Sequence, residues 1–289
     1  MKYLFVVTDV HSYYDEMIAA LKKQKFDINN ENHIFVSCGD LLDRGPDPQK
    51  CLDFVNSIPD DRKILIKGNH EELMENAIRR GMFFNHDYHN RTLDTVSKVT
   101  GFSIDDILYS DFTCLAACTA MDTNRSYREY TKKLRNFAEI GKYVFVHGWI
   151  PSYYKKCKDP YLDGQPMNST GRLNEDWKYY GDWEDAMWSN GMQKWRQGER
   201  LVDKTIVCGH FHASWGHSHI HHEGVEFVEV WYETQENDPE MIEHFEPFED
   251  EGIIALDGCT AYSGICNCVK LKVKESEWQS SMLENTMRE

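Results

Sequence analysis

Short apolar segments of strand length alternate with helical patterns along this chain, and this alternation most restricts how it can fold. The apolar segments at 2–9, 33–38 and 63–67 are separated by helical patterns at 13–23 and 48–57. In the first helical pattern, the apolar residues recur at the spacing of one helix face. Strand–helix–strand alternation favours parallel strands whose carboxyl ends meet at one edge of a sheet. We therefore predict an α/β fold with functional groups on the loops at that edge.

A single domain is expected over residues 1–274, because 41% of the 289 residues are hydrophobic and can supply one large core. Residues 72–140 show a helical pattern without a convincing strand, which predicts a helical insertion or cap. Strand-like segments return at 142–148 and 204–210. The stretch 149–203 between them is rich in aromatic residues, Gly and Asp, and we expect irregular loops that line a cleft.

Three further strands are predicted toward the end of the chain, at 225–231, 252–258 and 264–273. In the last of them, Cys266 and Cys268 would lie on one face of the strand, and we read both as idle thiols rather than metal ligands. The polar tail 275–289 is expected to fray.

Polar side chains follow five of the predicted strands. Each alone has an ordinary structural explanation, such as a helix cap, a turn or a hydrogen-bonded histidine. Their ordered repetition favours a metal site, and oxygen and imidazole donors without thiolate suit Mn²⁺, Fe or Zn²⁺. The residues are Asp9, His11, Asp40, Asn69, His70, His147, His210 and His212.

Two divalent ions can share this ligand set if one carboxylate bridges them. The first ion would take Asp9, His11, Asp40 and His212, and the second would take Asp40, Asn69, His147 and His210. With a bridging hydroxide, such a site keeps about one positive charge, which would hold a phosphate.

The overall charge and composition exclude several other classes of protein. A formal net charge of −16 argues against nonspecific binding to nucleic acid. No run approaches the roughly 20 apolar residues of a membrane span, and the first apolar stretch is too short for a signal peptide. Nine cysteines without a CxxC motif fit a reducing compartment, so we expect a cytoplasmic protein that does not bind membranes.

The sequence also resembles a known family. The blocks "DVH" at Asp9, "GDLLDRG" at Gly39, "GNHE" at Gly68, "HG" at His147 and "GHFH" at Gly209 are similar to the signatures of the calcineurin-like metallophosphoesterases. The second and third blocks resemble the phosphoprotein phosphatase branch, which includes bacterial and phage Ser/Thr phosphatases and symmetrical diadenosine tetraphosphate hydrolases. A late "ALDGCTAYSG" (255–264) is similar to the segment that closes the site in that branch. The resemblance implies two mixed β-sheets in a sandwich flanked by helices, in place of a single sheet.

The resemblance also implies roles for individual residues. Asp40 would bridge two metal ions, and Arg44 would hold two phosphoryl oxygens. Asp43 would orient His70, and His70 would protonate the leaving alkoxide. A hydroxide that bridges the metals, Mn²⁺ being the favoured ion, would attack phosphorus in line.

This chain departs from the family pattern at three points. Thr8 and Ser12 replace the two glycines that usually flank the first block. The second phosphate-binding Arg of many protein phosphatases has no counterpart before Arg196. His212 as a ligand is taken from the wider superfamily, since the phosphatase branch generally needs only His210.

These patterns predict a dinuclear metal-dependent phosphatase acting on phosphomonoesters, above all phosphorylated Ser, Thr or Tyr in proteins, or on small-molecule phosphoesters. A symmetrical dinucleoside polyphosphate hydrolase and a catalytically silent module that binds a phosphorylated partner are the alternatives. The natural substrate, the metal and the oligomeric state stay open. We interpret the cluster His217, His219, His221 and His222 as a solvated hairpin rather than a third metal site.

Overall fold

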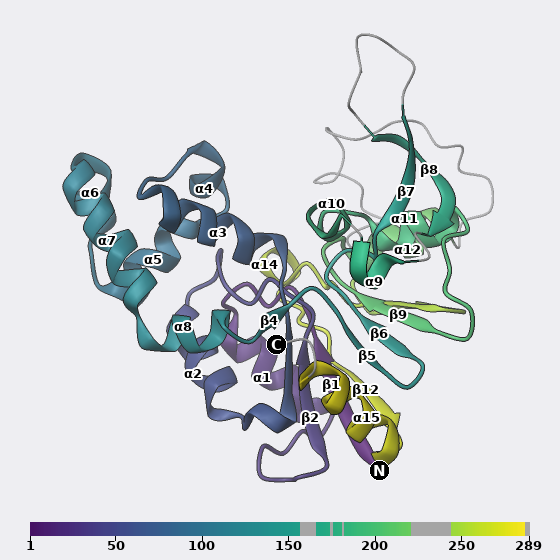
Figure 1. Cartoon of the computed structure of the whole chain (residues 1–289). Coiled ribbons are helices and arrows are strands. Elements are labelled where there is room, and N and C mark those ends of the chain that lie inside the picture. Colours follow the sequence, from purple (N-terminus) through teal and green to yellow (C-terminus); the bar gives the residue numbers. More distant parts are fainter. Residues whose placement is uncertain (157–165, 174–175, 181, 221–243, 287–289) are drawn as a thin grey trace.

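The computed structural model describes residues 1–156, 166–173, 176–180, 182–220 and 244–286. Two five-stranded mixed sheets form its centre, and helices flank them (Figure 1). The first sheet has the order β12-β1-β2-β3-β4 and the second the order β10-β11-β9-β6-β5. This arrangement confirms the expected α/β sandwich.

Parallel pairing dominates the first sheet, as the strand–helix alternation predicts. Strands β1 to β4 pair in parallel, and β12 pairs antiparallel with β1. In the second sheet β9 lies between β6 and β11 and is parallel to both, whereas the outer strands β5 and β10 are antiparallel to their neighbours. The strands of the first sheet are β1 (Lys2–Val7), β2 (His33–Ser37), β3 (Lys63–Ile66), β4 (Leu134–Arg135) and β12 (Val269–Val273). Those of the second are β5 (Ala138–Ile140), β6 (Tyr143–Phe145), β9 (Thr205–Cys208), β10 (Phe248–Asp250) and β11 (Ile253–Ala255).

Alternate residues of the strands separate the core into layers. Leu4 and Val6 of β1 belong to a buried cluster that also contains Phe145 and Val207, so this cluster fills the space between the two sheets. The side chains of Phe5 and Val7 point to the other face of the first sheet and belong to the buried cluster between that face and the helices. Successive side chains of a strand point to opposite faces of its sheet, so a strand that is buried on both faces contributes alternate residues to each cluster.

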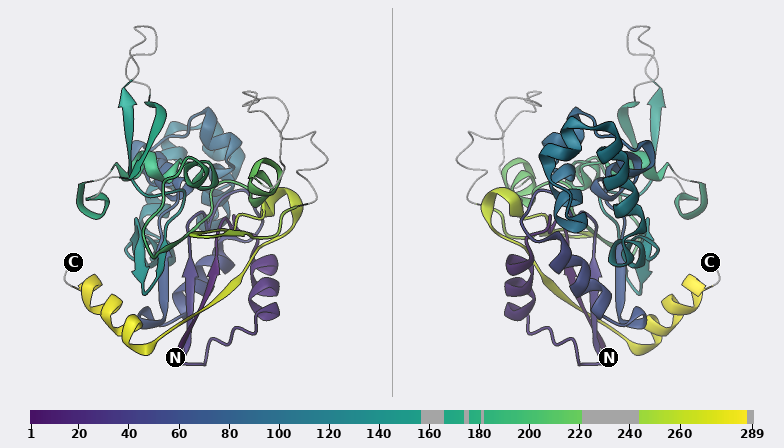
Figure 2. Two further views of the ribbon diagram at one scale, coloured as in Figure 1. Left: turned by 90° about the vertical axis from the view of Figure 1, so that its right-hand side faces the viewer. Right: turned by 90° about the vertical axis from the view of Figure 1, so that its left-hand side faces the viewer.

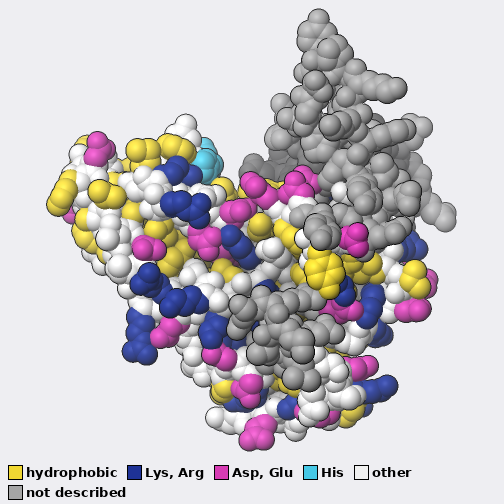
Figure 3. Space-filling model, viewed as in Figure 1, with side chains coloured by type: hydrophobic (Ala, Val, Ile, Leu, Met, Phe, Trp, Pro, Cys, Tyr) yellow, Lys and Arg dark blue, Asp and Glu magenta, His cyan; other side chains and the backbone are white. Residues whose placement is uncertain are grey.

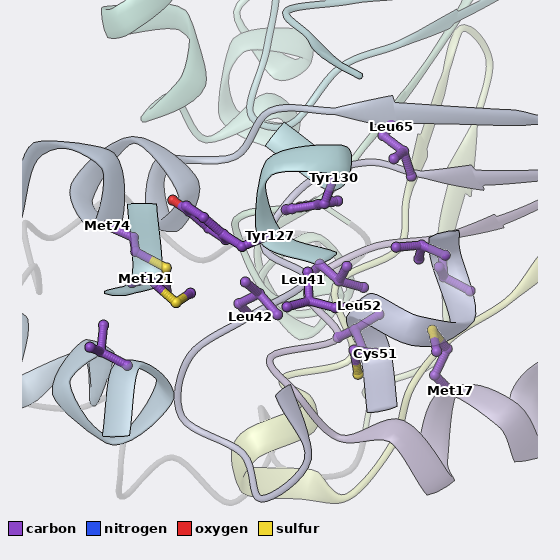
Figure 4. Close-up of a cluster of buried hydrophobic side chains, with 14 of the residues drawn as sticks. Met17, Leu41, Leu42, Cys51, Leu52, Leu65, Met74, Met121, Tyr127 and Tyr130 are labelled. Atoms are coloured by element: carbon purple, nitrogen blue, oxygen red, sulfur yellow. The ribbon is translucent and has the colours of Figure 1, made fainter. Parts of the chain in front are cut away.

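Helices cover the outer face of the first sheet. Figure 4 shows residues of this layer, which form one buried cluster: Met17 from α1, Leu52 from α2, Leu65 from β3, and Met74, Met121 and Tyr127 from the helical insertion. The insertion itself stands to one side of the sheets (Figures 1 and 2). The helices are α1 (Tyr14–Lys23), α2 (Pro48–Ser57), the 3₁₀ helix Asp60–Arg62, α3 (Asn69–Arg80), α4 (Asn85–His89), α5 (Thr92–Thr100), α6 (Ile104–Tyr109), α7 (Asp111–Thr123) and α8 (Arg125–Thr131).

Residues 72–140 are mostly helical, and their last part forms the short strands β4 and β5. Residues 149–203 differ more from the prediction of irregular loops. Their described part contains three helices, α9 (Trp177–Tyr180), α10 (Trp183–Met187) and α11 (Gly191–Arg196), and an antiparallel pair, β7 (Ser152–Lys156) with β8 (Pro166–Leu173). Asp182 and Asn190 cap α10 and α11, and Trp149, Trp177 and Trp195 pack on the second sheet.

The end of the chain also differs from the prediction. The tail forms helix α15 (Glu275–Thr286), because Trp278 is only 5% exposed and packs into the cluster between the sheets. Strand β12 begins at Val269, so Cys266 and Cys268 precede it, after the short helix α14 (Thr260–Ser263). The strand predicted at 225–231 lies outside the described residues.

His217 and His219 lie in helix α12 (Ala213–Ile220), so the hairpin expected there is wrong for the described residues. His221 and His222 lie outside them. On the face seen in Figure 3, acidic and basic side chains are interspersed. Within the described residues, no helix is both long and apolar enough to cross a membrane.

Candidate metal centre

The polar residues that follow the strands meet where the two sheets approach each other. Loops after β1, β2 and β3 contribute from the first sheet, and loops after β9 and β11 contribute from the second. They line a pocket of about 450 Å³. The lining residues from these loops and from the start of α3 are Asp9, His11, Asp40, Arg44, Asn69, His70, His210, His212 and Asp257.

The backbone of this pocket is strained. A positive φ is uncommon in residues other than glycine, and such strain gathers at functional sites. Six predicted site residues adopt it: Asp9 (48°), His11 (50°), Asp40 (52°), Asp43 (72°), Arg44 (59°) and His210 (68°). The loops after the strands therefore hold conformations that the residues would not adopt by themselves.

Asp40 lies at the centre of the donor atoms. Its Oδ1 is 3.5 Å from His147 Nε2, whereas its Oδ2 is 3.8 Å from His11 Nε2 and 4.0 Å from His70 Nε2. Two groups of potential ligands therefore share this carboxylate, and within each group the ligand atoms all lie within 4.8 Å of one another. The groups are His11, Asp40 and His70, and Asp40, His147 and His210.

Asn69 joins the second group. Its Oδ1 lies 2.8 Å from His147 Nε2 and 3.1 Å from His210 Nδ1. His147 donates its Nδ1 proton to the Cys38 carbonyl at 2.8 Å, so the lone pair of the other nitrogen in the neutral ring faces Asn69 and Asp40. Lone pairs that converge in this way, with the ring fixed from behind, are typical of metal ligands.

Asp9 and Asp257 add negative charge behind these donors. Burial and the neighbouring Asp257 raise the pKa of Asp9 to about 7, and burial raises the pKa of Asp257 to about 6. Asp9 accepts hydrogen bonds from the Thr8 hydroxyl at 2.5 Å and from the His210 amide at 3.0 Å. Several buried carboxylates in one pocket are the environment that a bound cation would stabilise.

Nearby histidines lower the pKa of Asp40, whereas the pKa values of Asp9 and Asp257 are raised. Burial alone would raise the pKa of Asp40, but His147, His70 and His11 outweigh it and lower the pKa overall. Burial lowers the pKa of His210 to about 3, so that its ring is neutral and able to ligate.

Arg44 lies between two of the histidines. Its guanidinium nitrogens are 3.0 Å from His11 Nε2 and 3.0 Å from His70 Nε2. A guanidinium can only donate, so both Nε2 atoms accept, and in the neutral form each ring carries its proton on Nδ1. The Nδ1 of His11 donates to the Leu42 carbonyl at 3.1 Å, and that of His70 donates to Asp43 at 2.9 Å.

Asp43 also influences the protonation of His70. Burial lowers the pKa of His70, but the carboxylates of Asp40 and Asp43 outweigh it and raise the pKa overall. The structure thus places Asp43 in contact with His70, and His70 beside Arg44.

A family model described as calcineurin-like phosphoesterase matches residues 3–242. The chain belongs to the calcineurin-like phosphoesterase family. Enzymes of this family hydrolyse phosphoesters and use divalent metal ions.

Curated relatives of this phosphoesterase match over shorter stretches. Serine/threonine-protein phosphatase 1 of Salmonella typhimurium is 32% identical over 76 residues, which are 26% of this chain and 33% of the relative. The symmetrical bis(5'-nucleosyl)-tetraphosphatase of Psychromonas ingrahamii is 39% identical over 67 residues, 23% of each chain. The chain thus matches no more than a third of the length of either relative.

One solved structure has a similar fold over more of this chain. The cold-active protein-tyrosine phosphatase of a psychrophilic Shewanella species has a TM-score of 0.51 at 17% identity, covering 94% of this chain and 76% of that one. At this identity the likeness shows the fold alone.

Two buried residues of the phosphoesterase that sequence reasoning missed fix the loop that carries Asp40. The Glu71 carboxylate accepts hydrogen bonds from the backbone amides of Asp40, Leu41 and Gly68, each at 2.9 Å. It also accepts one from the Tyr130 hydroxyl of α8 at 2.9 Å. Gly68 is required because a Cβ there would lie 2.2 Å from Asp40 Oδ1.

Asp257 was missed as well, although it follows β11 much as Asp9 follows β1. His212 does lie in the pocket wall of the phosphoesterase, with its Nε2 4.0 Å from Asp257 Oδ2, but neither it nor Asp9 belongs to the two close donor groups. Arg196 donates to the His219 carbonyl at 3.0 Å and is not among the pocket-lining residues. The rest of the wall comes from Leu73, His86, Asn90 and Trp188.

Proposed function

We propose that this phosphoesterase hydrolyses phosphomonoesters with two divalent metal ions, Mn²⁺ being the favoured metal, and that its substrates are phosphorylated Ser, Thr or Tyr side chains. The observation that carries the proposal is Asp40, whose two oxygens face two different groups of donors. A carboxylate in this position suits a bridge between two ions.

The chemistry of the donor set fits such ions, because it combines carboxylate, amide and imidazole groups without thiolate. Bound divalent ions lower the pKa of water and neutralise phosphoryl oxygens. The first ion would be held by Asp9, His11, Asp40 and His212, and the second by Asp40, Asn69, His147 and His210.

Two further residues act directly on the substrate in this proposal. Arg44 donates hydrogen bonds to the phosphoryl oxygens, for which its planar guanidinium is suited. Once Arg44 donates to the phosphoryl oxygens instead of to His70 Nε2, the His70 ring, protonated on both nitrogens, gives its Nε2 proton to the oxygen of the leaving group, while Asp43 holds the Nδ1 side of the ring. Because Arg44 lies 3.0 Å from His70 Nε2, a phosphoryl group held by Arg44 is next to the proton donor.

The pocket favours a substrate with one phosphoryl group. Among its described lining residues, Arg44 is the only Lys or Arg. A dinucleoside tetraphosphate needs cationic contacts for several phosphates, and the net charge of −16 slows the approach of a polyanion. The complete donor set also argues against the alternative of a silent binding module.

Symmetrical dinucleoside polyphosphate hydrolysis is the second candidate, and Trp188 favours it. Its indole lines the pocket, is 46% exposed and offers a surface on which a base can stack. Side-by-side kinetics with phosphopeptides and diadenosine tetraphosphate at matched pH and Mn²⁺ decide between the two. A kcat/KM at least tenfold higher for the dinucleotide would reverse our choice of substrate.

The cytoplasm is the proposed compartment. All eight described cysteines are free and seven of them are buried, which is in keeping with a reducing environment.

The Asp40→Asn variant tests the metal-dependent mechanism, because an amide cannot supply a charged bridge. We expect loss of phosphatase activity and a lower Mn²⁺ content in elemental analysis. Wild-type protein should lose activity on chelation and regain it with Mn²⁺. Full turnover after exhaustive chelation would rule out the mechanism.

A further inference from the structure

We propose that Thr92, in the helical insertion, is a positioning residue for Asp43 and through it for His70. The proposal rests on the proposed function only in taking His70 as the proton donor. It gives the insertion a part in the reaction that its sequence pattern does not indicate.

The contacts of Asp43 support this assignment. Its carboxylate is fully buried, and Oδ2 accepts hydrogen bonds from His70 Nδ1 at 2.9 Å and from the Thr92 hydroxyl at 2.8 Å. Within the described part of the chain, Oδ1 of Asp43 has no hydrogen-bond partner. Thr92 is itself fully buried, so water does not replace its hydroxyl.

The backbone at this point also depends on helix α5. Asp43 and Arg44 both have positive φ, of 72° and 59°, and such residues persist only where their surroundings hold them. Besides Thr92, α5 supplies Lys98, whose Nζ donates to the Gly45 carbonyl at 3.0 Å. Helix α5 therefore contacts the loop 43–45 at two points, the Asp43 side chain and the Gly45 carbonyl.

Loss of the Thr92 hydroxyl would leave His70 as the only described side-chain donor to Asp43. The carboxylate is then free to rotate, and the ring of His70 loses its fixed orientation toward the leaving group. Asp43 is in neither donor group around Asp40, and in the proposed function His70 holds no metal ion, so metal binding should not change.

Three variants test this. Thr92→Val keeps the shape of the side chain and removes its hydroxyl, and Thr92→Ser restores a hydroxyl. Thr95→Val is the matched control, because Thr95 lies on the same helix, is 1% exposed and has a hydroxyl with no hydrogen-bond partner among the described residues.

For Thr92→Val we expect kcat on an alkyl phosphomonoester to fall about tenfold or more, as is usual when a supporting hydrogen bond is removed. KM and Mn²⁺ content should not change, and the loss should be smaller on p-nitrophenyl phosphate, whose leaving group needs no proton. Thr92→Ser should recover most of the activity, and Thr95→Val should resemble wild type. An equal effect of the two valine variants would overturn the proposal.

A second readout does not depend on turnover. The His70 Nδ1 proton in its hydrogen bond to Asp43 should give a downfield proton NMR signal, identified by its absence in His70→Asn. This signal should shift or broaden in Thr92→Val and stay in place in Thr95→Val. If the wild type hydrolyses no phosphomonoester, the proposed function fails while this measurement still decides on Thr92, and an unchanged signal in Thr92→Val would refute the positioning role.

Discussion

His70 presents one ring nitrogen to the pocket and binds Asp43 with the other, so its replacement should affect proton transfer more than binding. We expect His70→Asn to lower kcat on an alkyl phosphate by roughly 10²–10⁴-fold, the range of general acid catalysis. The loss should shrink on p-nitrophenyl phosphate. Steady-state kinetics on both substrates measure the difference, with His89→Asn as a control because His89 is exposed and outside the pocket lining. Equal losses on both substrates would contradict the role of acid.

At the level of single residues, sequence could predict the side chains that directly follow strands. That Asp9, Asp40 and His210 lie in one pocket could be predicted in this way, because a strand end fixes where its next residues lie. Glu71, Tyr130 and Thr92 could not be found, since each acts through a hydrogen bond to a residue distant in sequence or to a backbone amide. Such contacts depend on tertiary packing and leave no local pattern.

Among the elements, helix α15 is more than a polar tail. Trp278 is 5% exposed and packs into the cluster between the sheets. Trp278→Ala should lower the free energy of unfolding by about 3–5 kcal/mol, the usual cost of removing a buried aromatic side chain. Urea unfolding measures this. Trp188→Ala is the comparison, since Trp188 is 46% exposed and should cost clearly less.

Strand β5 carries a carboxylate whose protonation should affect stability. Burial raises the pKa of Glu139, but ion pairs with Lys178 and Lys204 outweigh it, so its pKa in the folded protein is lowered. The unfolded chain then binds more protons below about pH 4.5, and the contribution of Glu139 to stability is lost as the pH falls.

Glu139→Gln should therefore lower stability near neutral pH by at most about 1 kcal/mol, because the pairs are partly exposed. The difference from wild type should decrease in acid. Urea unfolding from pH 3 to 7 tests this, and a difference that grows in acid would contradict the sign of the shift.

Element types were predictable where the apolar period was clear, as in β1, β2, α1 and α2. Residues 149–203 were not, because α9, α10 and α11 are each too short to show a helical period. Trp149, Trp177 and Trp195 are core residues of the second sheet, whereas Trp188 is exposed in the pocket wall. The spacing of aromatic residues does not distinguish packing from a binding surface. Helix α15 was missed because mostly polar residues surround Trp278.

At the scale of the whole molecule, loops from both sheets supply the lining of the pocket, including buried carboxylates. A metal ion bound there would contact residues of both sheets and should therefore stabilise the fold. Binding at 100 times the dissociation constant adds about 2.7 kcal/mol to the free energy of unfolding. We expect EDTA to lower the Tm and Mn²⁺ to raise it in a concentration-dependent way. Asp40→Asn should lose most of this response. If added Mn²⁺ does not change the Tm of the wild-type protein, this result would argue against a metal site between the sheets.

The pairing of β1 with β12 has a consequence for synthesis on the ribosome. Lys2 pairs with Val273, so β1 leaves the ribosome about 270 residues before the strand that pairs with its edge. Until then, one edge of β1 keeps unpaired amides and carbonyls, which other chains can capture. The nascent chain therefore needs protection along that edge until residue 273 has emerged.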